Sequence, residues 1–132
     1  NYGPGETIGS VHITVPDTMT MADIHPLTKS IAVHLYKKFG IAMTVGVYAE
    51  NQPSLEVLEV RQALDQVVSL YTHVVQVHAF YVQEEKKVIY YDIIFDFDEE
   101  DPHSTLEKIK AEMQKRYPDY TQFAIVDTDF SN

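Results

Sequence analysis

Apolar residues in this chain follow strand spacing and helix spacing in turn. Over residues 8–15 they alternate with polar residues, which is typical of a half-buried strand. Over residues 21–39 they recur at helical spacing, and Gly40 is suited to end that helix. A further strand is expected over residues 41–48. The first third of the chain therefore predicts a strand, a helix and a strand.

The remainder of the chain predicts a longer series of elements. They are a helix, a hairpin of two strands, a second helix and a last strand, over residues 54–70, 74–83, 87–98, 102–117 and 123–129. From residue 41 the order is βαββαβ, preceded by an extra βα. This order predicts an α+β fold of the ferredoxin-like or metallochaperone-like type, with helices on one face of an antiparallel sheet.

The strand, helix and strand of residues 9–51 recur over residues 89–131. Aligning the two helices brings three pairs together, His25 with His103, Ile31 with Ile109, and Leu35 with Met113. The most linker-like point is Asn51-Gln52-Pro53. Two tandem modules are therefore expected, a first one over residues 1–52 that is truncated at its start, and a second one over residues 53–132.

The net charge of the chain limits which kinds of ligand it is expected to bind. The chain has 132 residues, with 20 acidic residues against 10 basic ones and a net charge of −10. This balance opposes binding to nucleic acid, whose phosphates need Lys or Arg, and it suits a cation. The absence of cysteine excludes thiolate ligands. No apolar run has the length of a membrane span, so we expect the fragment itself to be soluble.

Histidine and aspartate residues of the second module are the candidate metal ligands. Imidazole and carboxylate groups together suit Zn²⁺, Mn²⁺ or Fe²⁺ better than Cu(I). Asp92 interrupts the most apolar strand of the chain, where a carboxylate needs a cation or hydrogen-bond donors. The opposing interpretation is a solvated or hydrogen-bonded aspartate. The predicted ligands are His78, Asp92, Asp127, Asp129 and His103.

The first module offers His12 and His25 at equivalent positions. Ala49 and Asn51 stand where the second module has its two final aspartates. Because a closed structural site usually has four ligands, these two histidines are weaker candidates. His34 and His73 lie outside the repeat and are expected to be surface or packing residues.

Signatures of enzymes are lacking. There is no glycine-rich phosphate loop, G-x-S-x-G or H-E-x-x-H sequence. The acidic run of residues 96–101 lacks the spacing and glycine of an EF-hand and is expected to be a solvated loop. We therefore expect a protein that is not an enzyme. Two alternatives to a metal-binding module stay open, a metal-free interaction or small-ligand sensor domain and, more weakly, a small metal-dependent hydrolase.

Several stretches resemble the cytoplasmic C-terminal part of bacterial cation diffusion facilitator transporters. They are NYGPGETIGSVHITVP, ADIHPLTKSI, VVQVHAFYV, KVIYYDIIFDF and YPDYTQFAIVDTDFS. The resemblance covers nearly the whole chain, as tandem copies of that family's metallochaperone-like module. It implies that the first copy lacks its leading helix and strand.

The resemblance also implies a function and site residues. It implies a regulatory and dimerisation domain on the cytoplasmic side of the membrane, which binds the transported cation, most simply Zn²⁺ or Mn²⁺, and acts on the membrane domain of the same full-length chain. The expected assembly is a homodimer or an intramolecular pseudo-dimer. The family's ligands match His78, Asp92, His103, Asp127 and Asp129 in the second module, and His12 and His25 in the first.

Overall fold

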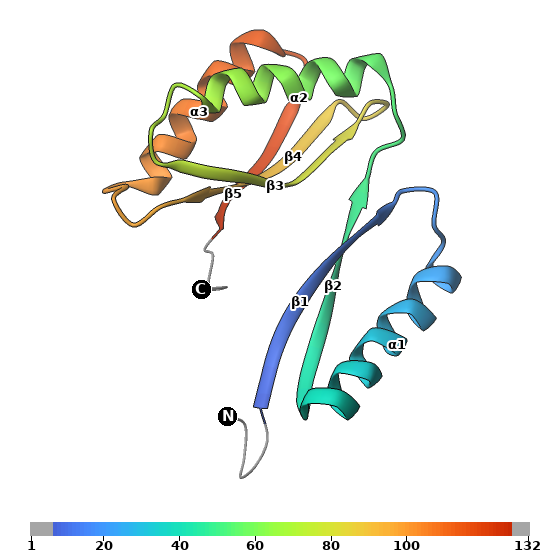
Figure 1. Ribbon diagram of the computed structural model, residues 1–132. Helices are drawn as coiled ribbons and strands as arrows, with labels where there is room; N and C mark the ends of the chain where they lie inside the picture. Colours follow the sequence, from blue (N-terminus) through green and yellow to red (C-terminus); the bar gives the residue numbers. More distant parts are fainter. Residues whose placement is uncertain (1–6, 128–132) are drawn as a thin grey trace. The chain divides into compact units, whose positions relative to one another are not determined.

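The computed structural model describes residues 7–127 and divides into two compact units, with the division between Gln52 and Pro53 (Figure 1). The first unit contains β1 (Thr7–Pro16), α1 (Met21–Phe39) and β2 (Ile41–Glu50). The second contains α2 (Leu55–Val68), β3 (Val74–Gln83), β4 (Val88–Phe95), α3 (Pro102–Arg116) and β5 (Thr121–Asp127). The predicted α+β class is confirmed, and the arrangement is consistent with a ferredoxin-like fold.

The first unit is a single βαβ element. β1 and β2 pair in parallel without interruption, from Thr7 opposite Ile41 to Pro16 opposite Glu50. α1 connects them and lies alongside β2 (Figure 1). Its start is fixed by a capping box between Thr20 and Asp23, and it ends at Gly40, whose φ of 68° suits glycine.

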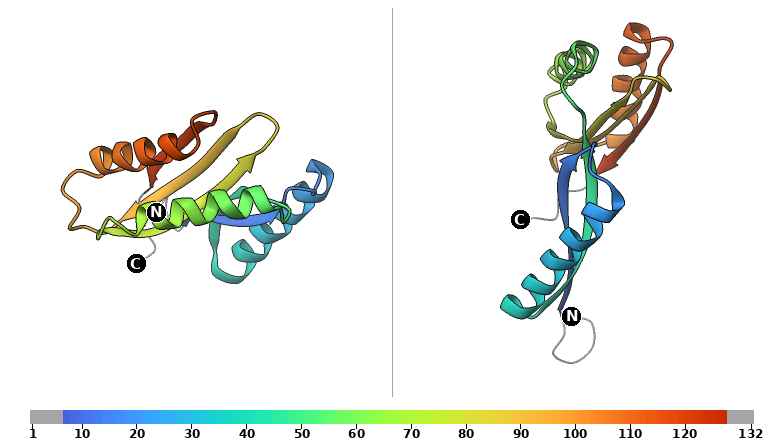
Figure 2. Two further views of the ribbon diagram at one scale, coloured as in Figure 1. Left: turned by 90° about the horizontal axis from the view of Figure 1, so that it is seen from above. Right: turned by 90° about the vertical axis from the view of Figure 1, so that its right-hand side faces the viewer.

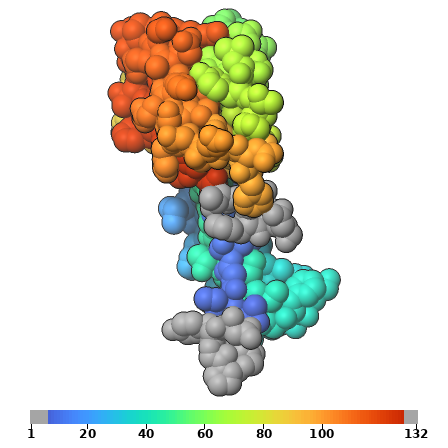
Figure 3. Space-filling model, turned by 90° about the vertical axis from the view of Figure 1, so that its left-hand side faces the viewer, coloured from blue at the N-terminus to red at the C-terminus, as the bar shows by residue number. Residues whose placement is uncertain are grey.

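The second unit has a three-stranded sheet in the order β3-β4-β5. β3 pairs with β4 in antiparallel orientation and β4 pairs with β5 in parallel. Both helices cover the same face of this sheet (Figures 1 and 2). They pack side by side, α2 in green and α3 in orange (Figure 3).

The strand pairing differs from the expected antiparallel sheet. Each βαβ connection returns the chain to its starting end, so β1 with β2 and β4 with β5 are parallel pairs. The strand expected to open a βαββαβ series is β2, and within the described residues it pairs with β1 alone. The last strand, β5, begins two residues earlier than expected, at Thr121.

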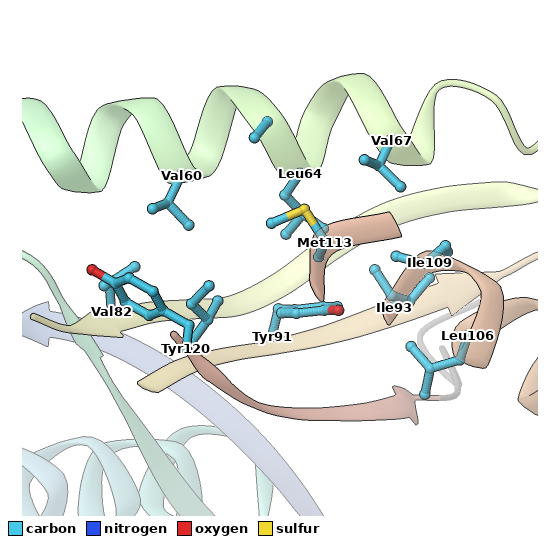
Figure 4. Close-up of a cluster of buried hydrophobic side chains, with 12 residues drawn as sticks. Val60, Leu64, Val67, Val82, Tyr91, Ile93, Leu106, Ile109, Met113 and Tyr120 are labelled. Carbon is cyan, nitrogen blue, oxygen red and sulfur yellow. The ribbon is translucent and has the colours of Figure 1, made fainter. Parts of the chain in front are cut away.

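A hydrophobic core fills the space between the helices and the sheet of the second unit (Figure 4). β4 contributes Tyr91 and its neighbours at alternate positions, while both helices contribute residues at helical spacing. The fully buried side chains are Val60, Leu64, Val67, Val82, Ile89, Tyr91, Ile93, Ile109 and Met113. In the described part of the first unit, by contrast, only Val15 is buried.

Tyr120 connects three elements of the second unit. Its hydroxyl donates a hydrogen bond to Oε1 of Glu56 in α2. The ammonium of Lys87, the residue before β4, lies 3.5 Å from the same oxygen and 5.1 Å from the centre of the Tyr120 ring. The Tyr120 hydrogen bond lowers the pKa of Glu56, partial desolvation opposes this, and the Lys87 charge adds to the lowering. Burial and the bond to Glu56 raise the pKa of Tyr120.

This arrangement predicts a pH dependence of stability. Because the pKa of Glu56 lies below its ordinary value of 4.5 in the folded protein, its contribution is complete above that value and is lost as the pH falls through the lower folded pKa. We expect Tyr120→Phe to destabilise the second unit at pH 7, and the difference from wild type to shrink in acid. Urea unfolding midpoints at pH 7 and at about pH 3.5 measure this.

Tyr117→Phe is the matched control, because the Tyr117 ring lies edge-on against Tyr120 and its hydroxyl has no hydrogen bond to Glu56 among the described contacts. Equal changes in midpoint for wild type and Tyr120→Phe between the two pH values would contradict the prediction.

Candidate metal centre

The open face of the second sheet carries two of the predicted ligands side by side. His78 of β3 lies directly opposite Asp92 of β4. Because side chains alternate along a strand, Asp92 points away from the core that Tyr91 and Ile93 enter. Both His78 and Asp92 are half-buried. Directly opposed residues have Cβ atoms about 5 Å apart, so these two side chains can share a ligand.

The other predicted ligands of the second unit are more dispersed. Asp127, the last residue of β5, lies opposite Ile94, which is two residues further along β4 than Asp92. His103 is exposed in the first turn of α3. Asp129 lies outside the described residues. His78, Asp92, Asp127 and His103 form no group of three ligand atoms within 4.8 Å of one another in the described part of the chain. Their role as ligands stays a prediction.

A different group meets that criterion. Ligand atoms of His73, Asp96 and Asp98 all lie within 4.8 Å of one another. His73 immediately precedes β3 and Asp96 immediately follows β4. The strand residues next to them, Val74 and Phe95, lie opposite each other. The backbone N–H of Asp96 donates to the carbonyl of His73 at 2.9 Å. The end of the hairpin therefore fixes the backbones of His73 and Asp96 against each other.

Side-chain contacts hold the group together. Nδ1 of His73 lies 3.0 Å from Oδ1 and 3.2 Å from Oδ2 of Asp96. The backbone N–H of Asp98 donates to Oδ1 of Asp96 at 2.9 Å, and a carboxylate oxygen of Asp98 lies within 4.8 Å of the ligand atoms of the other two residues. The His73 and Asp96 side chains are 40% and 41% exposed, so a cation can approach from solvent.

The chemistry of this group suits a divalent cation. One imidazole nitrogen and two carboxylates are ligands of Zn²⁺, Mn²⁺ and Fe²⁺, and three protein ligands leave positions for water or for a further group. Oxygen-rich ligation with one nitrogen also disfavours a soft cation. We call His73, Asp96 and Asp98 the hairpin-end group.

Sequence reasoning missed the hairpin-end group. His73 was expected to be a surface or packing residue, and the acidic run that includes Asp96 was expected to be a solvated loop. The positional signal was incomplete, because His73 precedes the predicted hairpin whereas Asp96 lies inside its second predicted strand, residues 87–98, which the structure ends at Phe95. Residues at the open end of a hairpin lie next to each other.

In the first unit, His12 lies on the sheet face opposite Val11 and Ile13. Its ring stacks on Tyr48, with centroids 5.1 Å apart and planes 20° apart. It also covers Gly46, where a Cβ atom would come within 2.3 Å of the imidazole. His25 is exposed on α1. Among the described residues, neither histidine joins a group of three potential ligands.

An open pocket of about 540 Å³ lies between α3 and β5. It is lined by Lys110, Gln114 and Gln122 among others, and by none of the predicted metal ligands. The Gln114 side chain donates to the carbonyls of Pro118 and Tyr120, and the Gln122 side chain donates to the carbonyl of Lys110. The two glutamine side chains of this pocket thus hold α3 to the start of β5.

Comparison with known proteins identifies no relative of this chain. No protein-family model, no curated protein and no solved structure matches the chain. In residues 7–127, no helix has the length and hydrophobicity that a membrane span requires.

Proposed function

We propose that this chain is the regulatory and dimerisation part of a divalent-cation efflux transporter, on the cytoplasmic side of the membrane, and that its second unit binds the cation. The observation that carries the cation-binding part is the hairpin-end group, in which one histidine and two aspartates place ligand atoms within 4.8 Å of one another. The link to a transporter rests on the sequence resemblance. The α+β fold of the second unit is consistent with it.

Charge supports a regulatory role for the cation. Residues 53–132 contain sixteen acidic residues against seven basic ones. Several of the acidic residues follow one another between β4 and α3, next to the hairpin-end group. A bound divalent cation lowers the repulsion among them and with a second copy. It thereby favours a more compact or more closely associated form, which a joined membrane domain would sense as a shift in population.

Calorimetric titration with Zn²⁺ and with Mn²⁺ tests the cation site. We expect wild type to bind one or both ions, and His73→Ala to bind them more weakly because it removes the only imidazole of the group. His34→Ala, at an exposed position of α1, is the matched control. Bound ion should also raise the unfolding free energy of the second unit, by about 2.7 kcal/mol at a hundredfold excess over Kd. Equal affinity in wild type and His73→Ala would refute the assignment.

The second candidate is a metal-free interaction or small-ligand sensor domain. Aromatic rings on the open sheet face favour it, because Tyr90 lies between Tyr81 and Phe123 with ring centroids 6.4 Å and 5.5 Å away. Phe123 is 58% exposed. Rings of this kind are common at binding surfaces. Metal analysis of the purified protein separates the two candidates, since a sensor of this kind would neither carry a divalent cation nor gain stability from one.

A further inference from the structure

The first unit leaves uncovered the positions that form the core of the second. The helix alignment pairs Ile31 with Ile109, and Leu35 with Met113. Ile109 and Met113 have no exposed surface, whereas Ile31 and Leu35 are half-buried and α1 has no buried residue at all. The helix and strands of the first unit thus form one side of a hydrophobic core. In the described part of this unit, no element packs against that side to complete the core.

The second unit shows what covers the equivalent surface. Its β4 and β5 correspond to β1 and β2, and β4 has β3 on its other edge in antiparallel orientation. α2 then lies beside α3 on the same face. In the described part of the chain, β1 pairs only with β2. The missing cover is therefore an antiparallel strand together with a helix on the same face as α1.

Among the described residues, no strand pairs with the edge of β1 that faces away from β2, and β1 lacks the usual protection of an edge strand. Natural edge strands are usually blunted by charged residues, internal proline or bulges, since a flat edge invites pairing with another chain. β1 contains no charged residue, its proline is its last residue, and its pairing with β2 is continuous over ten residues. β3, the edge strand of the second unit, has two register shifts.

We infer that β1 and α1 of a second copy cover this surface. A two-fold axis perpendicular to the sheet pairs β1 with β1 of the partner in antiparallel orientation. The product is a four-stranded sheet, β2-β1-β1-β2, with both α1 helices on one face, so each copy supplies the strand and the helix that the other lacks. This inference rests on the dimerisation part of the proposed function and is independent of the cation site.

Charge favours self-association through the first unit. Residues 1–52 contain four acidic residues and three basic ones, against sixteen and seven in the rest of the chain. Repulsion between two copies is therefore weak at the first unit and strong at the second. Apolar side chains of α1 are also available, with Leu27 37% exposed at the position equivalent to Thr105, which is 8% exposed.

Spin labels on single introduced cysteines test the geometry, because the chain has no cysteine of its own. Ser10 of β1 and Thr44 of β2 lie opposite each other, so one label at either position reports the same height along the strands. In metal-free buffer with chelator, we expect a dimer in which labels at residue 10 are closer than labels at residue 44. Measured across the strands, the two labels at residue 44 should be about 10 Å further apart than the two labels at residue 10, because two additional strand spacings separate them. A longer distance at residue 10 than at residue 44 would overturn the inference.

Leu27→Glu tests the helix side of the interface. We expect it to shift sedimentation toward the monomer, while Tyr36→Glu stays dimeric. Tyr36 is 57% exposed and lies two and a half helical turns further on, so it faces the opposite side of α1. A wild-type chain that is monomeric at every concentration, or equal dimerisation of the two variants, would overturn the inference and leave a helix and strand of another polypeptide segment as the occupant.

Discussion

Replacement of Ile109 by alanine is expected to lower the free energy of unfolding of the second unit by about 2–5 kcal/mol. Ile109 has no exposed surface and belongs to the cluster that α2, α3 and the sheet form together. Tyr91 and Leu64 are also fully buried in this cluster, so the side chains around a shortened residue 109 have little freedom to close the cavity. Urea unfolding followed by the signal of the tyrosines measures the change.

Ile31→Ala is the matched substitution in the first unit. Ile31 is half-buried, so its removal should cost about 1 kcal/mol, roughly half the burial energy of an aliphatic side chain. The comparison is made in the Leu27→Glu background, where we expect the first unit to be monomeric and Ile31 to lack a partner across the dimer. Equal costs for Ile109→Ala and Ile31→Ala in that background would contradict the view that only the second unit has a complete core.

Local signals in the sequence predicted the helices well. Gly40 was expected to end the first helix, and it does; Ser54 and Asp101, residue types that suit an N-cap, stand at the starts of α2 and α3. Ile109 and Met113, which the alignment of the two helices singled out, are spaced by about one helical turn and are both buried on α3. These features depend on neighbouring residues, which is why one sequence suffices for them.

Strand pairing depended on contacts that are distant in sequence. β2 could extend the second sheet or pair with β1, and its alternating pattern fits both partners. Whether a pair is parallel follows from the connection and from which edge is free, and hydrophobic alternation records neither. The antiparallel sheet was therefore wrong for two of the three strand pairs, although the α+β class was right.

Bulges in β3 explain why the candidate site could be predicted only in part. Near the hairpin turn Gln83 lies opposite Val88, and that regular register would place Ala79 opposite Asp92. A register shift between His78 and Tyr81, where Ala79 has a φ of 55°, brings His78 opposite Asp92 instead. A second shift between Val74 and Gln76 brings the strand ends together and sets His73 beside Asp96. The sequence of β3 gives no local sign of a bulge, because the strand contains no glycine.

Asp96→Asn is expected to weaken Zn²⁺ or Mn²⁺ binding by about tenfold or more, a change of at least about 1.4 kcal/mol. Asp96 is the centre of the hairpin-end group, since it contacts His73 Nδ1 and accepts from the Asp98 backbone. Asparagine has the same shape and keeps an oxygen that can accept from the Asp98 N–H, so the loop should retain its conformation. What it loses is the negative charge and one strong metal ligand.

Two further variants decide where the cation binds. Asp119→Asn removes the same charge at an exposed position away from the hairpin end, so it should leave the affinity nearly unchanged. Asp92→Ala removes the carboxylate opposite His78 on the open sheet face. If Asp92→Ala abolishes binding while Asp96→Asn behaves like Asp119→Asn, the hairpin-end group is refuted and the ion belongs to His78 and Asp92. If Asp96→Asn alone loses affinity, the acidic turn after β4 holds the cation, and repulsion in that turn is what the ion relieves.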